Sequence, residues 1–168
     1  MNTENNVFYH KSTYNNLTFN LELSKEIGLH CGTFEQANNR PGNYLYELVV
    51  DTSKMCELKD SLDIHWSGLS FLRELQGAGI IDAEQYSNFV KEFRDKLPAG
   101  DQEMYKSEFC RKVLRTLGYT GFIYANHVEG EGNSICIIDK DVIKTITPIS
   151  EALHNWSSEF KLYENLWD

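Results

Sequence analysis

The sequence predicts one α+β domain over residues 1–168, and two observations lead to that class. Short runs rich in β-branched and aromatic residues occupy both ends of the chain. Between them, from about 67 to 117, apolar residues recur at helical spacing. Strands, then helices, then strands again are typical of α+β domains rather than of chains that alternate strand and helix. The length is also sufficient to enclose one hydrophobic core.

The N-terminal part is expected to be rich in strands. The pattern predicts strands or extended segments at 7–10, 17–23, 27–31 and 44–50. The first of these ends in a polar turn that begins at Lys11. Thr33 stands where an N-cap would, so the residues after it, FEQANNR, are predicted to form one or two helical turns.

Glycines divide the helical middle. Gly77 and Gly79 interrupt the first run, and Asp82, with a glutamine three residues later, is predicted to cap a second helix. A third helix is expected from about 102 to 117, with Gly118 as its C-terminal stop.

Strand signals return after the helices, at 121–125, 134–138 and 142–146. A polar loop, 126–133, separates the first two of these strands. The tail, about 149–165, is amphipathic and is predicted to dock as a helix, and residues 60–66 are expected to form a loop.

The composition excludes several classes of function. The formal net charge is −9, and the chain lacks the basic stripe of a duplex-binding protein, so direct nucleic-acid binding is not expected. An acidic chain can instead be steered towards a basic protein surface. No run of about 18 apolar residues occurs, so no membrane span is expected. The N-terminus also lacks the basic start and apolar core of a secretory signal.

The cysteines indicate a reducing compartment. No Cys-x-x-Cys pair occurs, so a metal site is not expected. Without an export signal, reduced core thiols are expected rather than two disulfides, and the protein is expected to be cytoplasmic, either in its own cell or in a host cell. The cysteines concerned are Cys31, Cys56, Cys110 and Cys136.

Common phosphate-binding and hydrolase motifs are absent, but three segments place polar residues at strand ends. The first contains Tyr9, His10, Lys11, Ser12 and Thr13. Its histidine can donate a ring N–H to a ribose hydroxyl, and the backbone that follows can pair with a planar carboxamide. The alternative is a strand-end histidine whose hydrogen bonds are satisfied by the turn.

The second segment joins the predicted strand 27–31 to the short helix. Gly32 permits close backbone approach, and Thr33 as N-cap would turn the positive end of the helix towards a site. Arg40 is able to bind a phosphate through two parallel hydrogen bonds. The alternative is a plain strand–turn–helix corner.

The third segment is the glycine-rich loop 126–133, which carries Glu129 and Glu131. A carboxylate at a strand edge can hold a ribose 2′-hydroxyl, stabilise positive charge at the anomeric carbon and orient an incoming nucleophile. The alternative is a solvated acidic hairpin loop.

In this order the three segments resemble the ADP-ribosyltransferase superfamily, over residues 7 to about 146. Its members begin with a strand ending in a His-Gly-Thr-like step, here Tyr-His-Lys-Ser-Thr, and continue with a strand that leads into a helix, here Gly-Leu-His-Cys-Gly-Thr-Phe-Glu-Gln-Ala. A Tyr-Leu-Tyr-Glu-Leu-Val-Val strand with a later Asp60 and Trp66 also fits. A Gly-Tyr-Thr-Gly-Phe-Ile-Tyr strand, an Asn-x-x-Glu loop and a closing Ser-Ile-Cys-Ile-Ile-Asp strand then follow. Small phage and mobile-element members, and some anti-CRISPR ADP-ribosyltransferases, share this closing layout.

The resemblance implies a split β-sandwich of two small mixed sheets with a helical insertion, and it implies roles in binding NAD as substrate. His10 would bind the nicotinamide-side ribose, the next three residues would frame the nicotinamide, and His30 lies where many members carry a stacking Tyr. Either Glu129 or Glu131 would be the catalytic acid. The chain departs from the family at Lys11, where Gly is usual, and at His30. The other residues predicted to contact NAD are Tyr9, Gly32, Thr33 and Arg40.

Mono-ADP-ribosylation of a protein side chain, with release of nicotinamide, is therefore the expected function, and the partner is a protein target. Two alternatives stay open. The first is a binding or inhibitor protein on the same fold without catalysis, which Lys11, His30 and the acidic charge favour. The second is a toxin that hydrolyses NAD with water as the acceptor. The helical middle is a lid, a target-recognition insertion or part of the core.

Overall fold

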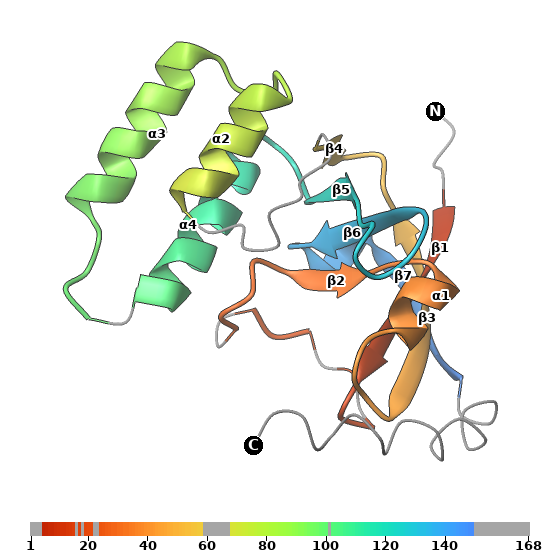
Figure 1. The fold of residues 1–168 in the computed structure, drawn as a ribbon. Coiled ribbons are helices and arrows are strands. Elements are labelled where there is room, and N and C mark those ends of the chain that lie inside the picture. Colours follow the sequence, from red (N-terminus) through yellow and green to blue (C-terminus); the bar gives the residue numbers. More distant parts are fainter. Residues whose placement is uncertain are drawn as a thin grey trace.

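The computed structural model describes residues 5–15, 17, 19–21, 24–58, 68–100 and 102–149. Two β-sheets and several helices confirm the predicted α+β class. They lie in three layers, with the helices of residues 69–116 on one side, a four-stranded sheet in the middle and a three-stranded sheet on the other side (Figure 1). The four-stranded sheet is thus the central layer.

The three-stranded sheet is antiparallel throughout and has the strand order β1-β3-β7. Its central strand contains alternating buried side chains and matches the predicted strand 44–50. The register pairs His10 with Tyr46, and it continues through Lys11 and Ser12. The bounds are Asn5–Ser12 for β1, Tyr44–Asp51 for β3 and Ile143–Ile149 for β7.

The four-stranded sheet is mixed and has the order β2-β6-β5-β4, in which only β4 and β5 are parallel. An antiparallel bridge between Tyr9 and Gly32 joins β1 of one sheet to the end of β2 in the other. The two sheets therefore meet along this edge. The bounds are Leu29–Cys31 for β2, Met55–Glu57 for β4, Gly121–Ala125 for β5 and Asn133–Ile137 for β6.

The core has two parts, which lie on opposite faces of the four-stranded sheet. Ile135 and Ile137 of β6 pack with β3 residues between the two sheets. Cys136 and Ile138, which alternate with them, belong to the cluster formed with the helices. This alternation along one strand explains how the middle layer serves both clusters.

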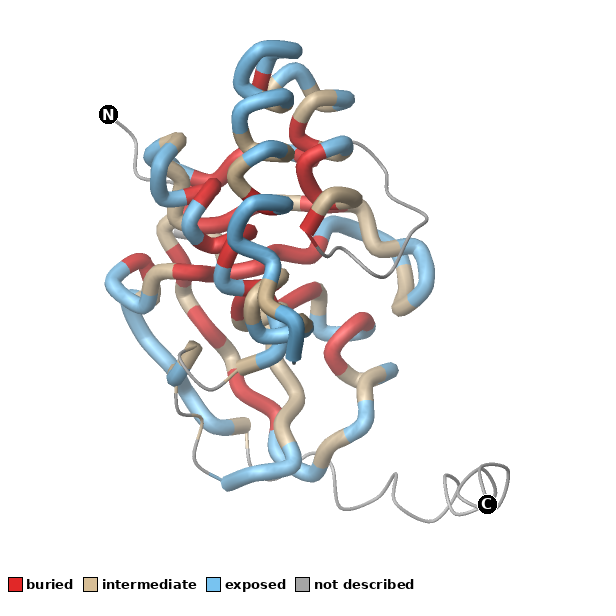
Figure 2. The backbone as a smooth tube through the Cα atoms, turned by 90° about the vertical axis from the view of Figure 1, so that its left-hand side faces the viewer, coloured by how far each residue is buried: buried red, intermediate tan, exposed pale blue. Residues whose placement is uncertain are grey.

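The helices in the middle of the chain are part of that second cluster rather than a detached lid. Helix α2 (Leu69–Gly77) contributes Phe71, Leu72 and Leu75, and helix α4 (Gln102–Thr116) contributes four buried residues to the same cluster. Helix α3 (Ala83–Asp95) buries Phe93 and exposes most of its other side chains. In Figure 2 buried and exposed stretches alternate along these helices, as expected of amphipathic helices on a sheet.

Two predicted helix boundaries are confirmed by their hydrogen bonds. Asp82 caps α3 in a capping box with Gln85, whose side chain accepts from the backbone N–H of Asp82. Gly118 has a positive φ of 83°, and it donates to the carbonyl of Arg115, while the next N–H donates to the carbonyl of Leu114. Both bonds are those of a glycine-terminated helix.

Several sequence predictions need correction. Lys11 and Ser12 were expected in a turn, but they continue β1 because both pair with β3. The described residues of 17–23, namely 17 and 19–21, form no strand. Strand β4 was not predicted, since three residues carry too little periodicity and its position depends on pairing with β5. Ile149 ends β7, and the rest of the predicted tail helix lies outside the described residues, as do Asp60, Trp66 and the expected loop 60–66.

All four cysteines are buried and free, as expected of thiols in a core. Among the described residues, no helix combines the length and the apolar character needed to cross a membrane. A short helix, α1 (Phe34–Asn38), and a 3₁₀ turn, η1 (Lys140–Val142), complete the elements.

Candidate functional site

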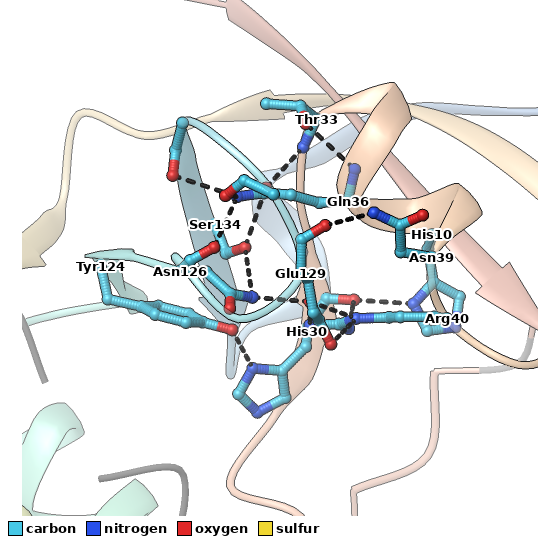
Figure 3. A network of polar contacts seen from close by, with 12 residues as sticks. His10, His30, Thr33, Gln36, Asn39, Arg40, Tyr124, Asn126, Glu129 and Ser134 are labelled. Carbon is cyan, nitrogen blue, oxygen red and sulfur yellow. Dashed lines mark hydrogen bonds and ion pairs between the residues drawn. The ribbon is translucent and has the colours of Figure 1, made fainter. Parts of the chain in front are cut away.

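The site lies where the two sheets meet and is built from three neighbouring pieces of chain. The bridge between Tyr9 and Gly32 holds β1 against the end of β2. Thr33 then caps α1, as predicted, by accepting from the N–H of Gln36 at 3.2 Å. The loop between β5 and β6 folds against α1 and closes the site (Figure 3).

An ion pair between Arg40 and Glu129 lies at the centre of the site. Arg40 Nε is 2.7 Å from both carboxylate oxygens, and Nη2 is 2.6 Å from Oε2. The side chains are only 19% and 26% exposed, so the pair is partly shielded from water. Burial disfavours the charge on Arg40, but Glu129 outweighs this effect and the pKa of Arg40 is raised.

Two asparagines add to the environment of Glu129. Asn126 Nδ2 donates to Oε2 of Glu129 at 2.6 Å, and Asn39 Nδ2 donates to the backbone carbonyl of Glu129 at 2.7 Å. Together with Arg40 they fix both the side chain and the backbone of this residue. The carboxylate is therefore held in one orientation.

His10 is linked to the same group through the backbone of His30. Its Nδ1 lies 2.7 Å from the carbonyl oxygen of His30, and Arg40 Nη1 donates to that oxygen at 3.2 Å. Because a carbonyl only accepts, Nδ1 of His10 carries the hydrogen. Burial lowers the pKa of His10, which favours the neutral ring, so Nε2 of His10 is an acceptor.

The side chain of His30 points towards β5. Its Nδ1 is 2.9 Å from the hydroxyl of Tyr124, and its ring meets those of Tyr124 and Phe122 edge to face. Burial lowers the pKa of His30 to about 3 and raises that of Tyr124 to about 12. Both side chains are therefore neutral at physiological pH.

Gln36 of α1 has the largest set of hydrogen bonds in the site and is fully buried. Its Nε2 faces three backbone carbonyls of the β5–β6 loop, those of Asn126, Gly130 and Gly132. Its Oε1 accepts from the N–H of Thr33. This bond completes a capping box at the start of α1, the second one in the fold.

The remaining predicted residues lie at the edge of this group. Tyr9 donates to Glu47 and packs edge to face on Phe34. Lys11 Nζ donates to the carbonyl of Asn38 at 3.1 Å, Ser12 accepts from the N–H of Tyr14, and Thr13 is exposed. Their predicted contacts with nicotinamide stay predictions.

The two candidate glutamates differ in their surroundings. Glu129 belongs to the central ion pair, whereas Glu131 is exposed. Arg40, which was predicted to bind phosphate, is paired with Glu129 in this chain. The structure thus gathers His10, His30, Gly32, Thr33, Arg40 and Glu129 around one junction.

Sequence reasoning missed Gln36, Asn39, Tyr124 and Ser134 as members of the site. A signal existed for Gln36, because a glutamine three residues after a capping threonine is a capping-box pattern. The contacts of the other three depend on how distant segments pack. Within the described residues, no group of three or more His, Cys, Asp or Glu side chains is placed to hold a metal ion.

Comparison of the chain with protein-family models gives no match, and neither does comparison with curated proteins. A crystal structure of an anti-CRISPR protein superposes with a TM-score of 0.42 and 16% sequence identity. The superposition covers 85% of this chain and 94% of that one.

Proposed function

We propose that this protein transfers ADP-ribose from NAD to a side chain of a protein target. The observation that carries the proposal is the meeting of Glu129, Arg40 and His10 at the junction of the sheets, linked through the carbonyl of His30. A charged, oriented carboxylate beside a neutral imidazole suits a substrate that has ribose hydroxyls and develops positive charge.

The proposed reaction breaks the bond between C1′ of the ribose and the nicotinamide nitrogen. The electron pair of this bond leaves with nicotinamide, which becomes neutral, and the positive charge moves to the ribose as an oxocarbenium ion. A nucleophile of the target protein then bonds to C1′ and releases its proton to solvent water. The catalytic requirement is a negative charge near C1′, which the carboxylate supplies.

Glu129 is the better of the two candidates for this role. Arg40 and Asn126 orient it, and its side chain keeps 26% exposure, which leaves it accessible to a substrate. Oε2 accepts from both of these residues, whereas Oε1 accepts from Arg40 alone among the described residues. Oε1 is therefore the oxygen proposed to hold the ribose 2′-hydroxyl. Glu131 is exposed, and no hydrogen bond or ion pair with another described residue orients it.

The tautomer of His10 in the structure changes the role proposed for this residue. A neutral His10 that donates from Nδ1 to His30 has only its Nε2 lone pair left for a ligand. We therefore propose that His10 accepts a hydrogen bond from a ribose hydroxyl rather than donating one. Arg40 is likewise proposed to hold the Glu129 carboxylate rather than to bind a phosphate.

The test incubates the protein with a cell extract and NAD labelled in its adenosine half, and then searches by mass spectrometry for proteins carrying ADP-ribose. Labelled target is expected with the wild type and with Glu131→Gln, and not with Glu129→Gln. Free ADP-ribose without labelled protein would identify an NAD hydrolase instead. If neither product is found and calorimetry detects no binding of NAD, the proposal is overturned.

One observation favours a second candidate, a binding protein without catalysis. Arg40 and Glu129 satisfy each other within the chain, so the group is stable without a ligand. A tight complex with an unmodified target that survives Glu129→Gln would establish this candidate and exclude the transferase.

A further inference from the structure

We propose that Gln36 is the positioning residue that fixes the Glu129 carboxylate. The catalytic consequence of this inference rests on the proposed function, but the positioning itself can be measured without NAD. Gln36 lies on α1, touches none of the atoms proposed to react, and acts through the loop that carries Glu129.

The first connection runs through the loop backbone. Gln36 Nε2 is 3.3 Å from the carbonyl of Asn126, 3.3 Å from that of Gly130 and 3.0 Å from that of Gly132. These carbonyls precede and follow Glu129 in the chain. One amide group thus ties together both ends of the segment that presents the carboxylate.

The second connection runs through side chains. The Ser134 hydroxyl donates to Gln36 Oε1 at 3.1 Å and accepts from Asn126 Nδ2 at 3.1 Å. Asn126 Nδ2 in turn donates to Glu129 Oε2. Gln36 is therefore connected to the carboxylate itself, and both Gln36 and Ser134 are fully buried.

The amide of Gln36 has one possible orientation. Its oxygen faces two donors, the N–H of Thr33 and the hydroxyl of Ser134, and its nitrogen faces only carbonyls. A flipped amide would place oxygen against three carbonyl oxygens. The contacts therefore specify a donor at Nε2 as well as an acceptor at Oε1.

The surrounding glycines leave room for this side chain. A Cβ on Gly32 would lie 2.4 Å from Gln36 Oε1, so only glycine fits there without displacing the amide. Gly130 and Gly132 have φ of 139° and 105°, which side chains rarely adopt. The sequence thus provides the space and the loop shape that the amide requires.

Helix capping alone does not account for Gln36. Gln85 occupies the same position in the capping box of α3, where its Oε1 accepts from Asp82 N–H at 3.0 Å, and it is exposed. The corresponding bond of Gln36 is 2.9 Å. A glutamine side chain can therefore complete a capping box while it is exposed. The burial of Gln36 goes with its additional contacts to the loop that carries Glu129.

The test uses Gln36→Glu, with Gln85→Glu as its matched control. Glutamate preserves both capping boxes but removes the amide donor. One readout is the solvent exchange of the Arg40 Nε–H by NMR, which reports the pairing with Glu129. The other is nicotinamide release from NAD, separated into kcat and KM.

For Gln36→Glu we expect faster exchange of the Arg40 Nε–H, a kcat lower by about 10-fold to 100-fold, and a KM changed by less than about 3-fold. Gln85→Glu is expected to match the wild type in both readouts. Unchanged exchange and unchanged kcat in Gln36→Glu would overturn the inference.

Ser134→Ala keeps the test decisive if Gln36→Glu does not fold by circular dichroism. It removes the link between Gln36 and Asn126, so the same changes are expected at smaller size, and wild-type behaviour would overturn the inference. A wild type that releases no nicotinamide would overturn the proposed function and the catalytic part of the inference. In that case exchange of the Arg40 Nε–H alone still decides whether Gln36 positions Glu129.

Discussion

Arg40 and Glu129 are 89 positions apart in the chain and meet through two guanidinium nitrogens, with N–O distances of 2.6 and 2.7 Å. Arg40 follows α1, and Glu129 lies in the loop between β5 and β6. The pair joins these two pieces of chain directly beside the bridge between the sheets. Its loss should therefore affect both stability and the site.

Arg40→Lys is expected to lower the free energy of unfolding by about 1–2 kcal/mol, since lysine cannot bind one carboxylate through two fixed nitrogens and the pair is partly buried. Urea unfolding measures the change. The control is Lys112→Ala, which removes a more exposed ion pair with Glu92 and should cost less than about 1 kcal/mol. Equal losses in the two variants would contradict a special role for the pair.

His30 makes stability depend on pH. Its pKa is about 3 in the fold and about 6.5 in the unfolded chain, so the unfolded state takes up the proton first as the pH falls. The stabilisation is present above about pH 6.5 and is lost progressively towards pH 3. Between about pH 6.5 and about pH 4.5 the wild type should lose about 2 kcal/mol more than His30→Asn, which keeps a polar group but does not titrate.

Chemical unfolding at several pH values measures this difference. His127→Gln serves as the control, because His127 is exposed, and it should follow the wild type. If His30→Asn and the wild type lose stability in parallel, the assignment of a neutral His30 in the fold is wrong.

The cysteines should be chemically inert in the native state. Burial raises the pKa of Cys31, Cys56 and Cys110 to about 12 and that of Cys136 well above its usual value. Very little thiolate is therefore present at pH 8. A thiol-reactive dye should label all four cysteines in denaturant. In buffer the labelling rate should be about 100-fold lower. Rapid labelling of any of them in buffer would place that cysteine at the surface.

Local signals predicted those parts of the fold that depend on neighbours in sequence. Asp82 and Gly118 mark helix ends because their hydrogen bonds stay within a few residues. Strand β3 was predicted because residues 44–50 are rich in β-branched and aromatic side chains. By contrast, Lys11 and Ser12 look like turn residues, and only pairing with β3 makes them a strand.

The site was predicted only in part, for the same reason. Segments that end at adjacent strand edges could be expected to meet, and His10 and His30 do so through the His30 carbonyl. The sequence alone did not favour Glu129 or Glu131, because their surroundings depend on the path of the glycine-rich loop. In the structure Glu129 is paired with Arg40, whereas Glu131 is exposed. The contacts of Gln36 join residues up to 98 positions apart, which no local pattern reveals.

Nicotinamide release from NAD tests the central claim most directly. The rate is measured for the wild type, Glu129→Gln and Glu131→Gln at pH 7.5 and saturating NAD, with target-containing extract present and with folding verified by circular dichroism. We expect Glu129→Gln to release nicotinamide at least about 100-fold more slowly than the wild type, and Glu131→Gln to stay within about 3-fold of it. No release by the wild type, or equal rates for the wild type and Glu129→Gln, would contradict NAD cleavage at this carboxylate.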